Sequence, residues 1–196
     1  MHPESDVFDQ VCTPDRGIDR QTLEAVVTLA VEVAREGREG RKIGTLFVVG
    51  DVDEVLRRSK EMILDPLLGH PNERKRITSH DTRETLKELA QLDGAFIVSD
   101  DGVVLSACRY VDATSHGINL PLGLGSRHMA AASVTRQTNA VAVVVSESSI
   151  VRVFDNGELI SEIIPEIWMM SRYSLHVSGP VKERAEQRIR VVTKSD

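Results

Sequence analysis

The segment LGSRH, from Leu124 to His128, places a hydroxyl, a guanidinium and an imidazole at the expected start of a helix. A helix N-terminus offers free backbone N–H groups and partial positive charge, which suit a phosphate. Gly125 lets backbone approach a ligand closely, and Ser126 can cap the helix or donate to a phosphate oxygen. Arg127 can bind a phosphate through two N–H groups, and the imidazole can hydrogen-bond or add charge. The motif alone also describes a capped helix with a solvated arginine, so both interpretations stay open.

Two acidic residues follow or precede expected strands. Asp93 stands between a helix and a strand and is followed by Gly94. A carboxylate in such a place can hold a metal or take a proton, although Asp-Gly is also typical of an ordinary turn. Ser146 and Glu147 follow the most apolar run of the chain, AVAVVV, and ligands of open α/β sheets lie outside the carboxyl ends of strands. Glu147 can therefore reach a divalent metal, but polar residues after a core strand are also common.

The spacing of apolar residues predicts the elements that would position these side chains. A helix with one buried face begins at Asp19 and stops at Gly37. Residues 44–50 form a continuously apolar strand, as expected of a strand covered on both faces. A second helix, capped by Asp51, carries apolar residues as far as Ile63. A polar loop with prolines and glycines separates it from a third helix.

The second half of the chain alternates in the same way. The third helix covers 81–92, and residues 94–111 read as two strands joined at an Asp-Asp-Gly turn. A helix at about 127–137 precedes the apolar strand, and a last hairpin turns at Asn156-Gly157. This pattern predicts an α/β fold: a single globular domain with a central mixed (parallel and antiparallel) sheet flanked by helices.

Composition limits the kind of protein. The chain has 196 residues, of which 41% are hydrophobic and 28% charged, as in one soluble globular domain. A net charge of -6 argues against general nucleic-acid binding but not against a single nucleotide held by local charges. Cys12 and Cys108 lie far apart and form neither a disulfide framework nor a paired zinc motif. No run reaches the roughly 20 apolar residues of a membrane span, and the acidic N-terminus lacks a signal-peptide core. We expect a cytoplasmic protein without membrane or nucleic-acid partners.

The three motifs are more specific together than apart. DGA at 93–95, LGSRH at 124–128 and VVVSE at 143–147 resemble the diadenylate cyclase (DAC) family. The segments GTLFVVGD, ETLKELAQLDGAFIVSDDGVV and TNAVAVVVSES match as well. The resemblance covers roughly residues 20–165 and looks closest to archaeal members. Members of this family join two ATP molecules into cyclic di-AMP and release two pyrophosphates.

This resemblance implies the roles of individual residues. Asp93, Arg127 and His128 would be catalytic, and Asp93 and Glu147 would bind Mn²⁺ or Mg²⁺. Because two ATP molecules must face each other, it also implies a face-to-face homodimer or a larger assembly. The ATP-binding residues that it implies are Gly94, Ala95, Tyr110, Val111, Leu124, Gly125, Ser126, Arg127, His128, Ser146 and Glu147.

Two departures from the family pattern bear on function. Ser126 replaces the usual threonine and keeps the hydroxyl, whereas Met129 replaces the second arginine of the motif and removes one charge. The alternative function is therefore a non-catalytic sensor that binds ATP or cyclic di-AMP. In either case the expected organisation is an N-terminal extension (1–19), a DAC catalytic domain (20–170) and a C-terminal segment (171–196).

Overall fold

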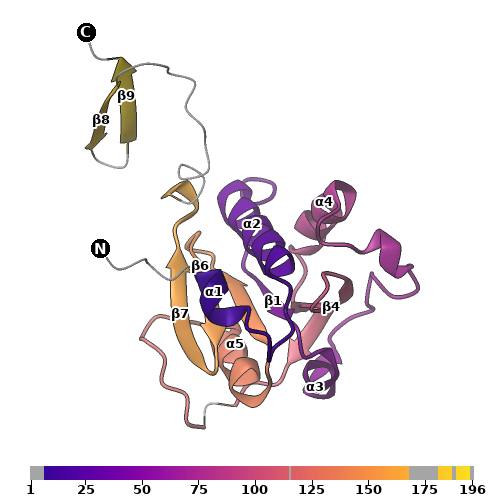
Figure 1. Cartoon of the computed structure of the whole chain (residues 1–196). Coiled ribbons are helices and arrows are strands. Elements are labelled where there is room, and N and C mark those ends of the chain that lie inside the picture. The colour runs from indigo at the N-terminus through magenta and orange to yellow at the C-terminus, as the bar shows by residue number, and fades with distance from the viewer. Residues whose placement is uncertain (1–6, 115, 168–180, 187–188, 195–196) are drawn as a thin grey trace.

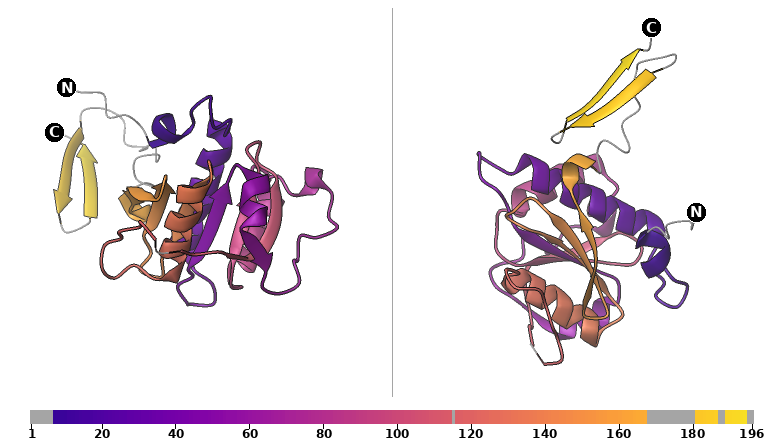
Figure 2. Two further views of the ribbon diagram at one scale, coloured as in Figure 1. Left: turned by 90° about the horizontal axis from the view of Figure 1, so that it is seen from below. Right: turned by 90° about the vertical axis from the view of Figure 1, so that its left-hand side faces the viewer.

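The computed structural model describes residues 7–114, 116–167, 181–186 and 189–194. Its main feature is a seven-stranded mixed sheet with helices on both faces (Figures 1 and 2), which confirms the predicted α/β class. The helices are α1 (Val7–Val11), α2 (Arg20–Glu36), α3 (Val52–Arg57), the 3₁₀ helix η1 (Asn72–Arg74), α4 (His80–Leu89) and α5 (Ser126–Gln137). The strands of this sheet are β1 (Thr45–Val49), β2 (Ser59–Glu61), β3 (Ala95–Val98), β4 (Val104–Val111), β5 (Val141–Val145), β6 (Val151–Asp155) and β7 (Glu158–Ile163).

Strand β1 lies at the centre of the sheet, whose order is β2-β4-β3-β1-β5-β6-β7. It runs parallel to β3, with Leu46 opposite Ala95, and antiparallel to β5, with Thr45 opposite Val145. The amino ends of β1 and β3 and the carboxyl end of β5 therefore meet at one edge of the sheet. Residues that directly precede β1 or β3, or directly follow β5, are brought together there.

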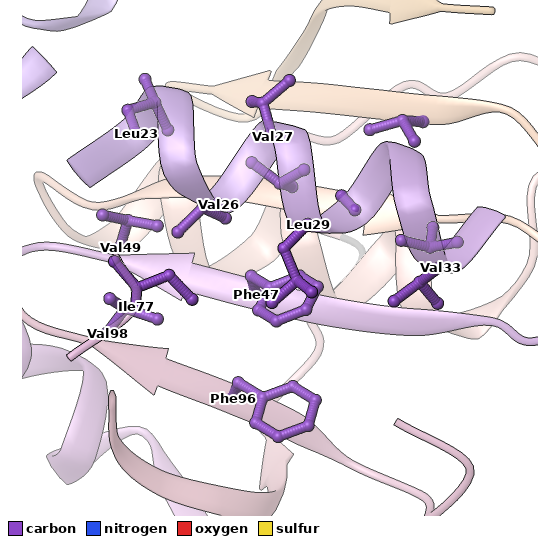
Figure 3. Packing of buried hydrophobic residues seen from close by; sticks show 14 of the residues in the cluster. Leu23, Val26, Val27, Leu29, Val33, Phe47, Val49, Ile77, Phe96 and Val98 are labelled. Atoms are coloured by element: carbon purple, nitrogen blue, oxygen red, sulfur yellow. The ribbon is translucent and has the colours of Figure 1, made fainter. Parts of the chain in front are cut away.

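One face of the sheet is covered by α1, α2 and α4. Helix α2 begins where Asp19 accepts a hydrogen bond from the Gln21 amide at 2.9 Å, so the predicted start is confirmed. Its apolar side lies over β1 and β3 (Figure 3). Beneath it, Phe47 and Phe96 stack with ring centroids 5.0 Å apart, and both side chains are almost fully buried. These rings fix the lateral fit of the two parallel strands.

The other face is covered by α3 and α5. Ala131, Ala132 and Val134 of α5 pack against Leu46 and other apolar residues of β1, β3 and β5. Because the alanines are small, α5 lies close to the sheet. Its N-terminus is thereby held near the edge where β1 and β3 begin.

Three local features differ from the sequence-based expectations. Within the predicted extension 1–19, the described part contains α1, and Phe8 and Val11 are buried in the core. The helix expected to reach Ile63 ends at Arg57, because Ser59–Glu61 pairs with the open edge of β4 instead. Asp51 occupies the N-cap position of α3 but makes no capping bond, and its carboxylate accepts a hydrogen bond from the backbone amide of Asn139 at 2.8 Å.

The predicted C-terminal segment is described only in part. Strands β8 (Val181–Glu186) and β9 (Ile189–Lys194) pair antiparallel as a separate two-stranded sheet. The rest of the segment lies outside the described residues. Among the residues that are described, no helix is long and apolar enough to cross a membrane.

The stacked rings predict a large effect of truncation on stability. Phe47→Ala removes a fully buried ring from between α2 and β3, so we expect the free energy of unfolding to fall by about 3–5 kcal/mol. Urea denaturation measures the change. Leu64→Ala is the control, since this side chain is 91% exposed and its loss should change the free energy by less than about 0.5 kcal/mol. Equal effects of the two changes would contradict the described core.

Candidate functional site

The three charged residues of the sequence motifs meet at the edge defined by β1, β3 and β5. Nη2 of Arg127 lies 3.1 Å from Oδ1 of Asp93, and its Nη1 lies 3.4 Å from Oε1 of Glu147. The guanidinium therefore bridges two carboxylates that are 34 and 20 residues away in the chain. Both carboxylate side chains stay open to solvent, with 77% and 71% exposure, whereas that of Arg127 is only 34% exposed.

The sheet register explains this meeting. Asp93 lies just before β3, and Glu147 lies just after β5. Arg127 is the second residue of α5, which packs on β1 and β5. The sequence analysis expected a ligand beyond the carboxyl ends of strands. This holds for β5, which Glu147 follows, but not for β3, since Asp93 precedes its amino end.

Gly44 is a site residue that the sequence analysis did not single out. It is buried directly before β1, and a Cβ added there would lie 2.9 Å from Nη1 of Arg127 and 3.3 Å from Cγ of Glu147. The absence of a side chain at Gly44 thus leaves the room in which the guanidinium lies. This contact joins residues that are far apart in sequence, so the sequence could not predict it. The only sequence signal at Gly44 is its position directly before an apolar strand.

A cavity of about 270 Å³ opens beside the three charged groups. Asp93 lines this cavity. Six of the predicted ATP-binding residues line it as well: Gly94, Ala95, Tyr110, Val111, Ser126 and Arg127. The other lining residues, not predicted, are Leu46, Met62, Arg109, Ala113 and Ala130. The cavity thus combines apolar lining residues with a few charged groups, which is typical of a small-molecule site.

Gly94 has a backbone role beneath this cavity. Its φ is +106°, and a Cβ there would lie 2.5 Å from the carbonyl carbon of Cys108 in β4. Cys108 itself has a φ of +55° at an irregularity in the pairing of β3 with β4. Asp65 stabilises the irregular backbone, since its carboxylate accepts bonds from the Ser106 hydroxyl at 2.6 Å and the Ala107 amide at 3.2 Å.

Tyr110 and Arg109 form the wall contributed by β4. The Tyr110 side chain is exposed rather than part of the core, and Nζ of Lys60 lies 5.2 Å from its ring centroid. Arg109 donates from Nε to the Ser59 hydroxyl at 2.9 Å and from Nη2 to the Ser59 carbonyl at 3.0 Å. Strand β2, which the sequence analysis missed, therefore orients this wall.

The N-terminus of α5 is open for an anion. Gly125 occupies the N-cap position, so no side chain caps the helix, and no acidic residue lies in the first turn. Ser126 is exposed at the first position, and Leu124 is half-buried beside it. Ser146 lies at the same edge, with its hydroxyl 2.9 Å from that of Ser148. Free N–H groups at this end suit phosphate oxygens.

His128 does not line the cavity. It is 6% exposed, and its Nε2 accepts a hydrogen bond from Nη1 of Arg152 at 3.2 Å. Its ring also meets that of Phe154 edge-on, with centroids 6.1 Å apart. Burial lowers the pKa of His128, and the nearby Arg152 and Arg127 guanidinium groups lower it further. The imidazole is therefore a neutral anchor of α5 on β6, on the opposite side of the helix from the cavity.

The acidic pair fits part of a metal site. Within the described ranges, no three His, Cys, Asp or Glu side chains form a group that could hold an ion alone. Nucleotide sites bind Mg²⁺ through one or two carboxylates together with substrate phosphates. Asp93 and Glu147 could provide these two carboxylate ligands, since both are exposed and pair with Arg127 in the first turn of α5.

These features together define a candidate nucleotide-binding domain: a mixed sheet flanked by helices, a helix N-terminus without a side-chain cap, and an acidic pair beside a largely apolar cavity. Comparison with protein families agrees: the model of the DAC family, "DisA bacterial checkpoint controller nucleotide-binding", matches residues 32–159. The chain therefore belongs to this family, and the resemblance identified in the sequence is confirmed.

Two archaeal relatives are named diadenylate cyclase. That of Methanocaldococcus jannaschii is 46% identical over 147 residues, which are 74% of this chain and 46% of the relative. That of Haloferax volcanii is 41% identical over 157 residues, which are 79% of this chain and 55% of the relative. The chain thus spans about half the length of the curated relatives it matches.

Solved structures support the fold. A hypothetical membrane spanning protein from Bacillus cereus aligns with a TM-score of 0.54 at 22% identity, covering 71% of this chain and 62% of that one. A double mutant of DacA from Staphylococcus aureus aligns with a TM-score of 0.50 at 20% identity, covering 77% and 92%. At such identities the likeness concerns the architecture alone.

The buried imidazole predicts a pH dependence of stability. Since the pKa of His128 is lowered in the folded protein, the unfolded chain binds the proton more tightly, and stability is lost as pH falls below about 6.5 toward the folded pKa. His128→Gln removes this titration, so its free energy of unfolding should fall less between pH 7.5 and 5 than that of the parent protein, as measured by urea denaturation. His116→Gln, at an exposed position, should keep the parental dependence. An unchanged slope in His128→Gln would refute the neutral buried imidazole.

Proposed function

We propose that this chain is a diadenylate cyclase that condenses two ATP molecules into cyclic di-AMP and releases two pyrophosphates. The observation that carries the proposal is the meeting of Asp93, Arg127 and Glu147 at the open N-terminus of α5. Membership of the DAC family, and the names of its archaeal relatives, support the same activity. Residues 20–170 are the proposed catalytic domain.

The reaction assigns distinct roles to the two sides of the site. The 3′-oxygen of one ATP bonds to the α-phosphorus of the other, the bond to pyrophosphate breaks, and the hydroxyl proton leaves; a second such step closes the ring. Asp93 is proposed to orient the 3′-hydroxyl and help activate it, as one of the two carboxylates that would also hold the metal ion. Its exposed carboxylate is accessible to a substrate once the pairing with Arg127 is given up.

The phosphates are proposed to bind at the start of α5. Backbone of Leu124 and Gly125, the hydroxyl of Ser126 and the guanidinium of Arg127 provide donors there. Ser146, at the end of β5, completes this side. Since His128 is buried away from the cavity, we propose that it acts as a positioning residue that holds α5, in place of the direct phosphate contact expected from the sequence.

The adenine and ribose are proposed to occupy the cavity. Gly94 and Ala95 leave space at the beginning of β3, while Tyr110 and Val111 provide the wall on β4. Asp93 and Glu147 would hold Mn²⁺ or Mg²⁺ together with the phosphates. When bound, such an ion neutralises charge that develops on the phosphate oxygens.

The exposure of the acidic pair supports assembly of two copies. A single protomer leaves Asp93 and Glu147 open to solvent, whereas the product needs two ATP molecules in opposite orientation. We propose a face-to-face homodimer, or a larger assembly that pairs such faces. A substrate as abundant in the cytoplasm as ATP supports a cytoplasmic location, and the net charge of -6 supports the absence of a nucleic-acid partner. No membrane partner is proposed.

One observation favours a second candidate function. Met129 stands where the family usually has arginine, so one phosphate-binding charge is missing from the first turn of α5. A sensor that binds ATP or cyclic di-AMP without turnover would tolerate this loss. Turnover of ATP distinguishes the two candidates.

The activity predicts the effect of removing one carboxylate charge. The parent protein, incubated with ATP and Mn²⁺ or Mg²⁺, should form cyclic di-AMP that mass spectrometry detects. Asp93→Asn should lower the rate by roughly 100-fold or more, because it removes the negative charge that is proposed to activate the hydroxyl and hold the metal ion. Its urea denaturation curve should match that of the parent, since the side chain is 77% exposed. Full activity in the variant would refute the role of Asp93, while ATP binding without product in the parent would establish the sensor.

The close packing at Gly44 predicts a second loss of activity. The methyl group in Gly44→Ala displaces Nη1 of Arg127, and a shift of about 1 Å in a positioning group costs on the order of 100-fold in rate. The same assay measures this loss. Gly40→Ala is the control: a Cβ there meets no atom within 4 Å, and its left-handed φ of +75° affects stability rather than the site. Equal rates in Gly44→Ala and the parent would exclude this contact from the mechanism.

A further inference from the structure

A second cavity lies on the opposite side of the sheet from α5. It has a volume of about 580 Å³ and lies between α4 and the segment that joins β2 to α4. Its lining residues are Pro66, Leu67, His70, Glu73, Arg74, Lys75, Ser79, Asp81, Thr82, Thr85, Leu86, Leu89 and Val104. It shares none of them with the cavity beside Asp93.

Lys75 is the unusual residue of this cavity. Its side chain lines the cavity, although the residue is only 8% exposed. Its backbone is fixed, since the amide donates to the Asn72 carbonyl at 3.0 Å and the carbonyl accepts from the Val104 amide at 2.8 Å. Among the ion pairs and hydrogen bonds of the described residues, none involves its ammonium group. Its Nζ is not among the fully enclosed side-chain atoms of the described residues, so the ammonium is open to solvent and can pair with an anion in the cavity without giving up a carboxylate partner.

The N-terminus of α4 points to the same ligand chemistry. Ser79 occupies the N-cap position but makes no capping bond with its side chain, and Thr82 uses its hydroxyl to donate to the Arg74 carbonyl at 3.0 Å. The first N–H groups of this ten-residue helix thus remain available near Lys75. Two independent sources of positive potential, a helix end and a buried lysine, therefore meet in one cavity.

The remaining walls limit the size and charge of a ligand. Leu67, Leu86 and Val104 are buried and provide an apolar surface. Glu73 and Asp81 are exposed acidic residues of the lining, and they disfavour a ligand with several negative charges. The volume is within the usual range for small-molecule sites, roughly 300–1,000 Å³.

We propose that this cavity binds a small organic molecule that carries one phosphate or carboxylate group on an apolar body. The anionic group would pair with Lys75 and the N-terminus of α4, and the apolar body would lie against Leu67, Leu86 and Val104. This site does not depend on the proposed cyclase activity, because it uses other residues on the other face of the sheet.

The test uses three probes of similar size: phenyl phosphate, benzoate and uncharged benzyl alcohol. In ¹⁵N-labelled full-length protein, the two anions should shift the amide signals of Lys75 and the first turn of α4, and the alcohol should bind more weakly. Lys75→Met removes the charge that would pair with the anionic group, so it should weaken the binding of both anions by roughly tenfold or more. Lys75→Arg should retain binding, and Lys42→Met, at an exposed position, should match the parent.

The outcomes separate clearly. The anion that binds more tightly identifies the preferred head group, and either preference supports the site. Equal binding of the uncharged probe, unchanged affinity in Lys75→Met, or shifts confined to Ser126 and Arg127 would overturn the proposal. If Lys75→Met does not fold, the first turn of α4 is tested through His80→Pro, which removes one free N–H group at the first helical position, where proline is tolerated, and leaves the lysine in place. This change should weaken the binding of both anions, and unchanged affinity would overturn the proposal.

Discussion

The pairing of β1 with both β3 and β5 is the constraint on which the rest of the structure depends. Parallel pairing on one side and antiparallel pairing on the other bring two strand beginnings and one strand end to a single edge. Asp93 and Glu147 are neighbours only because of this register. A shift of one residue in either pairing would turn alternate side chains to the other face of the sheet and separate the acidic pair.

The charged centre shows how close packing and electrostatics act together. Small residues let α5 approach the sheet, and the missing side chain of Gly44 makes room for the guanidinium between the carboxylates. A neutral imidazole on the buried side of the helix links it to Arg152, which in turn pairs with Glu162 of β7 at 2.6 Å. The orientation of Arg127 therefore depends on residues that lie in, or directly next to, five strands: β1, β3, β5, β6 and β7.

Much of this arrangement followed from local sequence signals. The helix from Asp19, the buried strand at 44–50 and the turn at Asn156-Gly157 were predicted because periodicity and turn residues act over short distances. The sequence did not predict the three-residue strand β2, since pairing with β4 decides its structure. It also did not predict the burial of His128, because adjacent helical residues differ in direction by about 100° and only packing selects the buried one. The close contact of Gly44 with Arg127 joins residues far apart in the chain, so no local pattern revealed it.

The bridging arginine has a consequence for the order in which components arrive. The single positive charge of its guanidinium offsets only one of the two negative charges of Asp93 and Glu147, and a divalent ion that entered alone would have to compete with Arg127 for these carboxylates. A nucleotide that carries its own chelated ion offers phosphates to Arg127 at the same moment as it offers a cation to the carboxylates. If the site binds ATP and a divalent ion as proposed, these ion pairs would favour a preformed metal–nucleotide complex over loading that begins with the metal.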